Sequence, residues 1–546
     1  MPFRRVEPIS LRTPLALLLI SLGAIAAVWW WLATPITLAR APIDPKAKLL
    51  CVSYAPFRGA QTPLDPATRV SADQIAQDLA QLAKISDCVR TYSIENGLDQ
   101  VPALAAKAGL KVMQGIWLGS NRLKNATQIS TAVRLSKEYP GVITSLVVGN
   151  EVLLRGEMTT TDLAAIIRGV KAQVSVPVTY ADVWEYWLRY REIYEVVDFI
   201  TIHILPYWED FPIRAKFAAT HVNLIRQRMA VTFPGKEILI GETGWPSQGR
   251  MREGALPSRT NQARVVSEIL QMAKTENFRV NLIEAYDQPW KRQLEGTVGG
   301  FWGLFNSERR ELKYPPGEPI SNFPLWKWQM GAGLLLSLIV FVSAWGTTRR
   351  KPWTPRMTSW IAVGLTATSA GILLGIAADK MFFESYGIGG WLQWGALLAA
   401  GIVASIFGAN AIISGRTMPT FLDLFGPRGE GERLAASMWL LGLSLVVTAV
   451  IATETALGFV FDPRYKDFPY ASLTMAVVPF AGLLLNRPQA GRRPIAEAVF
   501  AGLLAIAAVY IGYNEGNENW QAMWTCAVYF AFAITLWQAR AAQSPK

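Results

Sequence analysis

The chain shows two different patterns of hydrophobic and polar positions, one after the other. Between about residues 48 and 286, short apolar runs alternate with amphipathic stretches such as 71–85 and 259–275. This alternation predicts buried strands, each followed by a helix with one apolar face. We expect strands near 49–54, 87–91, 110–116, 144–149, 176–181, 197–204, 237–241 and 279–286. Eight such units in about 275 residues predict an α/β fold, the (β/α)8 TIM barrel.

The second pattern consists of apolar runs of about 16 to 23 residues between short polar loops, the length that crosses a bilayer core of ~30 Å. We predict spans near 15–33, 326–345, 358–378, 391–413, 434–456, 471–485, 495–513 and 520–538. The chain then has three parts. Residues 1–39 form a cytoplasmic amino terminus and a signal-anchor transmembrane helix, 40–325 the barrel, and 326–546 a membrane domain with about seven transmembrane helices.

The distribution of Lys and Arg predicts the orientation of these spans. With the amino terminus inside, 15 Lys and Arg residues fall on the cytoplasmic side, and three, Lys380, Arg464 and Lys466, fall in the short outer loops. Positive charge is enriched in cytoplasmic loops, so the barrel is expected on the periplasmic or extracytoplasmic side of the inner (cell) membrane. The lipid bilayer is thus an expected partner. The same bias accounts for most of the net charge of +12, so nucleic-acid binding is not indicated.

The first apolar run has an alternative interpretation as a cleaved signal peptide. Ala39-Arg40-Ala41 resembles a cleavage site of the A-x-A kind. The length of the run at 15–33, which contains Trp29-Trp30-Trp31 near its outer end, favours an uncleaved anchor. Both interpretations place the barrel on the same side of the membrane.

Two predicted strands end in a carboxylate. Glu151 follows Ser145-Leu-Val-Val-Gly-Asn150, and Glu242 follows Ile238-Leu-Ile-Gly241. In a barrel these residues end strands four and seven, so both face the cleft at the carboxyl rim. Paired carboxylates in this position are what glycoside hydrolysis requires: one protonates the leaving oxygen and the other attacks the sugar carbon. The alternative is that each Glu only caps a strand or pairs with an Arg.

The motifs around these residues resemble glycoside hydrolase family 17, the β-1,3-glucanases and glucan transglycosylases. The resemblance rests on Gly241-Glu-Thr-Gly-Trp-Pro-Ser247 and Gly149-Asn150-Glu151, and it covers roughly residues 48–312. Further matches are Tyr54-Ala-Pro-Phe57, Val89-Arg-Thr-Tyr92 and Glu284-Ala-Tyr-Asp-Gln-Pro-Trp-Lys291. The segment His203-Ile-Leu-Pro-Tyr-Trp208 departs from the family, which more often has an Asn there.

The resemblance implies a retaining enzyme similar to bacterial membrane-bound proteins named β-(1→6) glucan synthase. Glu242 is then the nucleophile, and Glu151 the acid/base, which needs a raised pKa to start protonated. Around them we expect a set of rim residues to bind substrate: Tyr54, Arg90, Asn150, Tyr207, Trp245, Glu284, Asp287, Trp290 and Lys291.

These rim residues have two kinds of expected contact. The aromatic rings suit the C–H faces of glucose, with core packing as the alternative. We expect Trp245 and Trp290 to face the cleft, whereas the two interpretations are evenly balanced for Trp117. Glu284 and Asp287 are expected either to hydrogen-bond sugar hydroxyls or to hold Lys291 and Arg90 in an ion network.

Other chemistries are disfavoured by composition. The chain has two histidines, His203 and His221, and no Gly-rich phosphate loop after a strand, so we expect neither a metal nor a cofactor. A solitary strand histidine such as His203 is expected to be a core or rim residue. Cys51 and Cys88 lie on neighbouring predicted strands and could either bridge in an oxidising compartment or remain buried thiols.

The predicted function is thus retaining hydrolysis or transglycosylation of β-1,3-glucan. We expect the enzyme to remodel periplasmic glucan or add β-1,6 branches to it, rather than to degrade it. A separate glucan synthase is a candidate partner, because the loops between spans are too short to bind a nucleotide sugar. One alternative is a plain endo-β-1,3-glucanase. An alternative of another class is a glucan exporter or synthase-partner subunit whose barrel only holds the chain.

Overall fold

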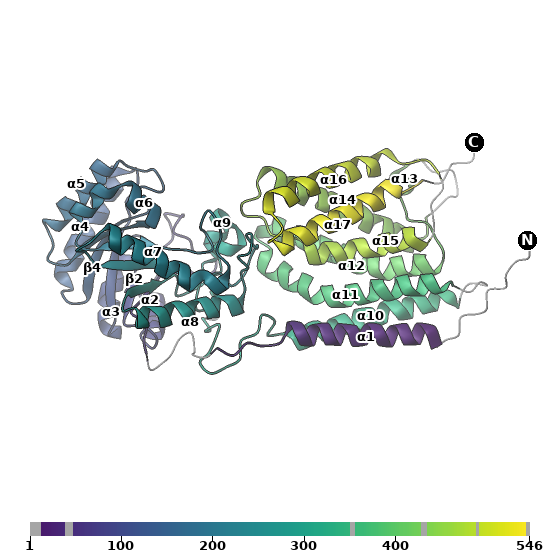
Figure 1. Ribbon diagram of the computed structural model, residues 1–546, viewed down its shortest axis with the longest axis horizontal. Coiled ribbons are helices and arrows are strands. Elements are labelled where there is room, and N and C mark those ends of the chain that lie inside the picture. The colour runs from purple at the N-terminus through teal and green to yellow at the C-terminus, as the bar shows by residue number, and fades with distance from the viewer. Residues whose placement is uncertain are drawn as a thin grey trace, which may run out of the picture. The chain divides into compact units, whose positions relative to one another are not determined.

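The computed structural model describes residues 12–38, 47–308, 310–349, 355–426, 434–486 and 491–541 (Figure 1). The chain divides into two compact units. One is Pro35–Ile320, and the other combines Met1–Thr34 with Ser321–Lys546. The candidate cleavage site Ala39-Arg40-Ala41 lies outside the described residues.

The first unit is a closed barrel of eight parallel strands, each paired with its neighbours in sequence, and β1 with β8. This confirms the predicted TIM barrel. The strands are β1 Cys51–Ser53, β2 Cys88–Arg90, β3 Lys111–Ile116, β4 Ile143–Asn150, β5 Val178–Val183, β6 Ile200–His203, β7 Ile238–Thr243 and β8 Arg279–Leu282. The eighth is shorter than the predicted 279–286, so Glu284 and the residues after it belong to the loop at the rim.

Helices follow the strands and surround them (Figure 1). They are α2 Ala72–Leu82, α3 Val101–Ala108, α4 Arg122–Glu138, α5 Thr160–Lys171, α6 Trp184–Arg189, α7 Ala218–Thr232, α8 Arg259–Thr275 and α9 Arg292–Gly299. Polar residues fix several of the helix starts. Ser71, Thr159 and Ser258 each accept a hydrogen bond from the backbone N–H three residues later, which satisfies a donor that the first turn leaves free.

The strand residues divide between two buried clusters. Apolar residues such as Val52, Val89 and Ile240 join the large core between strands and helices. A separate small cluster takes residues from around the ring: Cys51, Cys88, Met113, Val147, Ala181, Phe199 and Leu239. Because strand side chains alternate between faces, this second cluster fills the barrel interior. Within it Cys51 and Cys88 form a disulfide, one of the two alternatives that the sequence left open.

The second unit is helical. It contains α1 Arg12–Leu32, α10 Trp326–Thr348, α11 Met357–Glu384, α12 Gly387–Ile413, α13 Phe421–Phe425, α14 Ala436–Phe461, α15 Tyr470–Asn486, α16 Ile495–Glu515 and α17 Trp520–Gln538. Helix α1, from the start of the chain, packs against α10 and α11. Small residues permit close packing between α10 and α11: a Cβ on Gly333 would lie 2.0 Å from the carbonyl oxygen of Gly371.

Among the described residues, six helices are long and apolar enough to cross a membrane: α1, α10, α11, α12, α14 and α16. They coincide with six of the eight predicted spans. The other two predicted spans, 471–485 and 520–538, are also helical. Helix α15 is apolar but shorter, and α17 contains polar residues such as Gln521 and Thr525, so these two spans remain predictions.

Candidate active site

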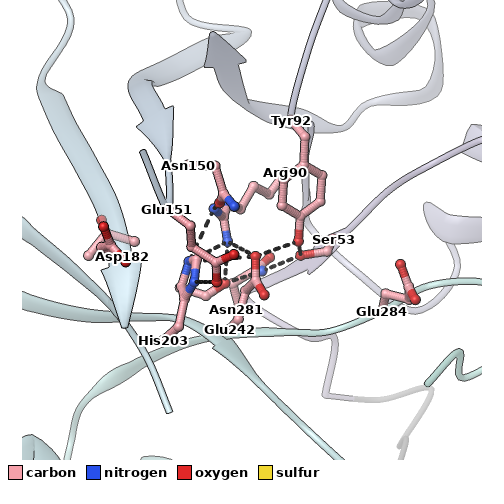
Figure 2. A network of polar contacts seen from close by, with 12 residues as sticks. Ser53, Arg90, Tyr92, Asn150, Glu151, Asp182, His203, Glu242, Asn281 and Glu284 are labelled. Carbon is pink, nitrogen blue, oxygen red and sulfur yellow. Dashed lines mark hydrogen bonds and ion pairs between the residues drawn. The ribbon is translucent and has the colours of Figure 1, made fainter. Parts of the chain in front are cut away.

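The acid/base candidate Glu151 lies on a sharp turn directly after β4. Its backbone is in the left-handed region, with φ of 54°, and Gly149 just before it has φ of 89°. A Cβ on Gly149 would meet Val152 at 2.8 Å, so glycine is required there. The Glu151 N–H donates to the Ala181 carbonyl of β5 at 2.8 Å. The Gly-Asn-Glu sequence thus turns the chain so that the carboxylate points toward Glu242 (Figure 2).

The second carboxylate, Glu242, lies within β7 and is 5% exposed. Its Oε1 atom accepts hydrogen bonds from the Tyr92 hydroxyl at 2.8 Å and from Arg90 Nη1 at 3.1 Å. Oxygens of Glu151 and Glu242 lie within 4.8 Å of each other. Carboxylates of retaining glycosidases are about 5–5.5 Å apart and those of inverting enzymes about 6.5–9.5 Å, so this spacing matches the retaining arrangement.

Arg90, on β2, connects the two motifs. Its side chain is fully buried and donates to Asn150 Oδ1 at 2.6 Å and to the Gly241 carbonyl at 2.7 Å, in addition to Glu242. A buried guanidinium is tolerated only with partners of this kind. The guanidinium therefore holds Asn150 and Glu242 in a fixed geometry, and its charge offsets that of the buried carboxylate.

Tyr92 and its neighbours support Glu242 from the opposite side to Glu151. The Tyr92 hydroxyl lies 2.8 Å from Glu242 and 2.9 Å from Ser53 Oγ, which also accepts from Asn281 at 2.8 Å. Burial and the charge of Glu242 raise the pKa of Tyr92, so it remains a hydrogen-bond donor. Sequence reasoning noted the Val89–Tyr92 motif but did not select Tyr92, Ser53 or Asn281 as site residues.

The site residue that the sequence analysis most clearly missed is His203, at the end of β6. It is fully buried, with Nδ1 2.8 Å from Glu151 Oε1 and Nε2 3.5 Å from Glu242 Oε1. Its Nε2 also lies 3.4 Å from Arg90 Nη1. The histidine therefore bridges the two carboxylates (Figure 2). The sequence did contain a signal for this role: a histidine stands at a strand end where the family more often has an Asn.

The protonation of Glu151 differs from the expectation. Burial alone would raise its pKa, but the hydrogen bond and charge of His203, together with the charges of Arg155 and Arg90, lower it below the ordinary value. The unliganded site therefore favours the ionised form of Glu151, whereas the acid step requires its protonated form.

Glu151, His203 and Glu242 also offer three atoms close enough to share a metal ion. The surrounding donors make this a poor cation site. Arg90 and Tyr92 already donate to Glu242, and a cation between the three groups would sit beside the buried guanidinium. These contacts suit a nucleophile and an acid/base better than they suit metal ligands.

Three of the predicted sugar-binding aromatics are not available at the surface. Tyr54, Tyr207 and Trp245 are at most 1% exposed. The Tyr54 hydroxyl donates to Asp78 at 3.1 Å, and the Trp245 indole N–H donates to the Leu256 carbonyl at 3.1 Å. Their rings are packed into the core, which was the alternative considered for them, and the cleft-facing prediction for Trp245 is corrected accordingly.

Two other aromatics keep part of their surface open. Trp290 is half-buried against Phe57, at 6.2 Å between ring centroids. Trp117 follows β3 and is 37% exposed. The Arg155 guanidinium, from the turn after Glu151, lies 4.2 Å above the Trp117 ring. These two rings are therefore the candidates for sugar stacking at the rim.

The carboxylates after β8 form ion pairs. Lys291 Nζ contacts the two carboxylate oxygens of Glu284 at 3.0 and 2.9 Å, and Lys313 Nζ contacts Asp287 at 2.7 Å. This agrees with the predicted pairing of Glu284 with Lys291. Arg90, however, binds Glu242 and not this network, because β2 aims it across the barrel.

Burial and the ion pair have opposite effects on the pKa values of Glu284 and Lys291. Burial raises the pKa of Glu284 to about 7, although Lys291 opposes the shift. Burial lowers the pKa of Lys291, but the negative charges of Glu284 and Glu295 outweigh burial, so the pKa of Lys291 is raised overall. The two short contacts favour the ionised pair. In Figure 2, Glu284 lies apart from the Glu151–Glu242 cluster.

Together, a closed (β/α)8 barrel and two carboxylates within 4.8 Å at its carboxyl rim, one buried and one half-buried, define a glycosidase-type enzyme. Residues 51–303 match the family model of the BtgE/BtgC glycoside hydrolase domain. Over these residues the barrel is similar to this family of glycoside hydrolases.

Individual relatives are similar to the same part of the chain. A glucan 1,3-beta-glucosidase of Candida albicans is 26% identical over 260 residues, which are 43% of this chain and 84% of that protein. A probable family 17 glucosidase of Saccharomyces cerevisiae is 23% identical over 262 residues, 47% of this chain and 64% of that protein. Among solved structures, a family 17 beta-1,3-glucanosyltransferase from Rhizomucor miehei is 23% identical, covers 48% of this chain and 95% of its own, and gives a TM-score of 0.43.

Proposed function

We propose that the barrel is a retaining enzyme acting on β-1,3-glucan, and that it transfers glucan to a sugar acceptor more readily than to water. The observation that carries this proposal is the separation of the Glu151 and Glu242 oxygens, within 4.8 Å. The names of the relatives, glucan 1,3-beta-glucosidase and beta-1,3-glucanosyltransferase, support β-1,3-glucan as the substrate.

In the first step, Glu242 attacks the anomeric carbon of a glucosyl unit. Among the described residues, the hydrogen bonds to Glu242 from Tyr92 and Arg90 fall on Oε1, so Oε2 is the atom that attacks. The new bond joins this oxygen to the anomeric carbon, while the bond to the leaving sugar oxygen breaks. Glu151 gives its proton to that oxygen, and the shortened glucan leaves.

In the second step, Glu151 acts as the base. It removes a proton from the hydroxyl of the acceptor, whose oxygen attacks the anomeric carbon and releases Glu242. Water as the acceptor gives hydrolysis, and a sugar gives transfer. An aromatic platform that binds the acceptor sugar favours transfer, and Trp117 and Trp290 have the exposure to act in this way. A 6-hydroxyl acceptor would produce the β-1,6 branch that we propose for remodelled glucan.

The remaining features support a location at the membrane with the barrel outside the cytoplasm. Six helices of the described residues have the length and composition of spans. The Cys51–Cys88 disulfide suits an oxidising compartment such as the periplasm. Cytoplasmic reporter fusions after Arg428 and Arg493, and a periplasm-dependent phosphatase after Leu312, test this topology. An inactive phosphatase in the Leu312 fusion would overturn the location.

The function is tested with the full-length chain in detergent and a single β-1,3-linked hexasaccharide as donor and acceptor. Products longer than the donor, with a new linkage visible by NMR, are expected for the transferase. Only shorter products at millimolar donor would instead favour the plain endo-β-1,3-glucanase.

A second experiment separates an enzyme from the alternative of a synthase-partner subunit that only holds glucan. In Glu151→Ala, a donor with a good leaving group should still form the glycosyl-enzyme, because its departure needs no proton. Azide, a small anion that needs no general base, should then speed up the second step and yield a glycosyl azide. A barrel that binds the hexasaccharide without turnover, both in the parent protein and in Glu151→Ala, would favour the holding subunit.

A further inference from the structure

The turn that carries Glu151 is held by the neighbouring strand β5, through residues that the sequence analysis did not select. Tyr180 and Asp182 lie on this strand and are 1% and 0% exposed. The Leu153 N–H donates to the Tyr180 hydroxyl at 3.0 Å, and this hydroxyl donates to Asp182 Oδ2. The Leu154 N–H approaches the same oxygen at 3.4 Å. A chain of hydrogen bonds therefore links the turn to a buried carboxylate.

Three consecutive residues of β5 take part in this attachment. Between Tyr180 and Asp182, the Ala181 carbonyl accepts the Glu151 N–H at 2.8 Å. Glu151 needs such support, because its φ of 54° is unfavourable for a residue with a side chain and persists only where the surroundings impose it. The β5 contacts thus determine where the Glu151 carboxylate points.

Asp182 also belongs to the charge environment of Glu151. Glu151 faces His203 on β6, Arg90 on β2 and Arg155 on its own turn, with Glu242 of β7 on the far side of His203. Burial raises the pKa of Asp182 to about 6, and the charge of Glu151 adds to this rise. The hydrogen bond from Tyr180, the charge of His203 and the hydrogen bond from the Val183 N–H oppose it. Of the two carboxylates, Asp182 therefore holds a proton more readily than Glu151, whose pKa is lowered.

We propose that Tyr180 and Asp182 are positioning residues for the acid/base: Tyr180 holds the turn through the Leu153 N–H, and Asp182 holds the Tyr180 hydroxyl and the Leu154 N–H. This proposal rests on the proposed role of Glu151. The two residues keep the Glu151 carboxylate aimed at the leaving oxygen, where it must deliver its proton.

Two variants separate the two parts of the proposal. Asp182→Asn keeps an oxygen that can accept from Tyr180 and Leu154 but removes the charge. Tyr180→Phe keeps the charge but removes the acceptor for Leu153. Asp198→Asn is the matched control, because Asp198 accepts the Val178 N–H at 2.7 Å at the opposite end of β5. The full-length protein in detergent is assayed against pH with a β-1,3-linked hexasaccharide and with a dinitrophenyl β-laminaribioside, whose leaving group needs no proton.

For Asp182→Asn, activity on the hexasaccharide is expected to fall by less than in Tyr180→Phe and the alkaline limb of kcat/KM to stay in place, because the amide oxygen still accepts from Tyr180 and Leu154. For Tyr180→Phe, activity on the hexasaccharide is expected to fall about tenfold with the limb unmoved, and activity on the dinitrophenyl donor to change little. The control should resemble the parent protein in both assays.

Equal losses on both donors would indicate a merely structural role and overturn the proposal, as would a larger loss in Asp182→Asn than in Tyr180→Phe. A failure of the underlying assignment would look different. If Glu151 is not the acid/base, Glu151→Ala itself would lose activity equally on the two donors, whatever the β5 variants do.

Discussion

The two ends of the barrel strands bury opposite kinds of side chain, and the change occurs over a very short distance. On β2, Cys88 joins the interior cluster and the disulfide, while Arg90 belongs to the charged site. The two residues are separated by one position, so they share a face of the strand roughly 7 Å apart. On β7, Leu239 and Glu242 show the same change from apolar to charged.

This difference shows how the barrel can bring charges together without losing its core. The lower interior is closed by apolar side chains and a covalent bridge, which hold the strands in register. The upper interior can then contain an arginine, a histidine and two carboxylates, each paired with another. Stability and chemistry therefore depend on different layers of the same strands, and mutations in the two layers should have different consequences.

The largest effect is expected in the upper layer, for Glu242→Gln. Loss of the nucleophile should lower kcat on a β-1,3-linked hexasaccharide by at least about a thousandfold. The amide keeps the size of the side chain and can still accept from Tyr92, but it removes the charge paired with the buried Arg90, so the melting temperature should fall as well. Turnover and thermal unfolding of the full-length protein check both parts, and near-normal turnover would remove Glu242 from the mechanism.

The next largest effect is expected in the lower layer, for the double variant Cys51→Ser and Cys88→Ser. The bridge joins residues 37 positions apart, and a loop of this length corresponds to about 3–4 kcal/mol of unfolding free energy. Denaturant unfolding should show this loss, with kcat almost unchanged well below the transition. A large drop in kcat for the still folded variant would mean that the two layers are not independent.

The smallest of these effects concerns the pH dependence of the upper layer. His203 lowers the pKa of Glu151 through its hydrogen bond and charge. In His203→Asn the positive charge is absent, so the pKa of Glu151 should rise. Protonated Glu151 then persists to higher pH, and the alkaline limb of kcat/KM should move upward. A limb that moves down, or not at all, would show that His203 does not control the proton of Glu151.

The sequence predicted those parts of the molecule that depend on local pattern. The eight strands and the two strand-end carboxylates follow from apolar runs that stop at Gly-Asn-Glu and Gly-Glu. The pairing of Glu284 with Lys291 was also one of the expected alternatives.

The parts that the sequence did not predict depend on contacts between distant segments. His203 and Glu151 are 52 residues apart and meet because β4 and β6 end at the same rim. The rings of Tyr207 and Trp245 pack edge to face with centroids 6.1 Å apart. The position of Trp245 after a strand-end Glu does not indicate which loops will cover its ring. The anchoring of Glu151 by Tyr180 depends in the same way on the pairing of β4 with β5.

The central claim is that Glu151 and Glu242 act in a double displacement, and the configuration of the first-formed product tests it most directly. Full-length enzyme in detergent is mixed with a β-1,3-linked hexasaccharide, and proton NMR follows the new anomeric signals before mutarotation. The carboxylate oxygens lie within 4.8 Å, which predicts that the β anomer appears first. First appearance of the α anomer would require an inverting reaction with water between the carboxylates, and would contradict the account.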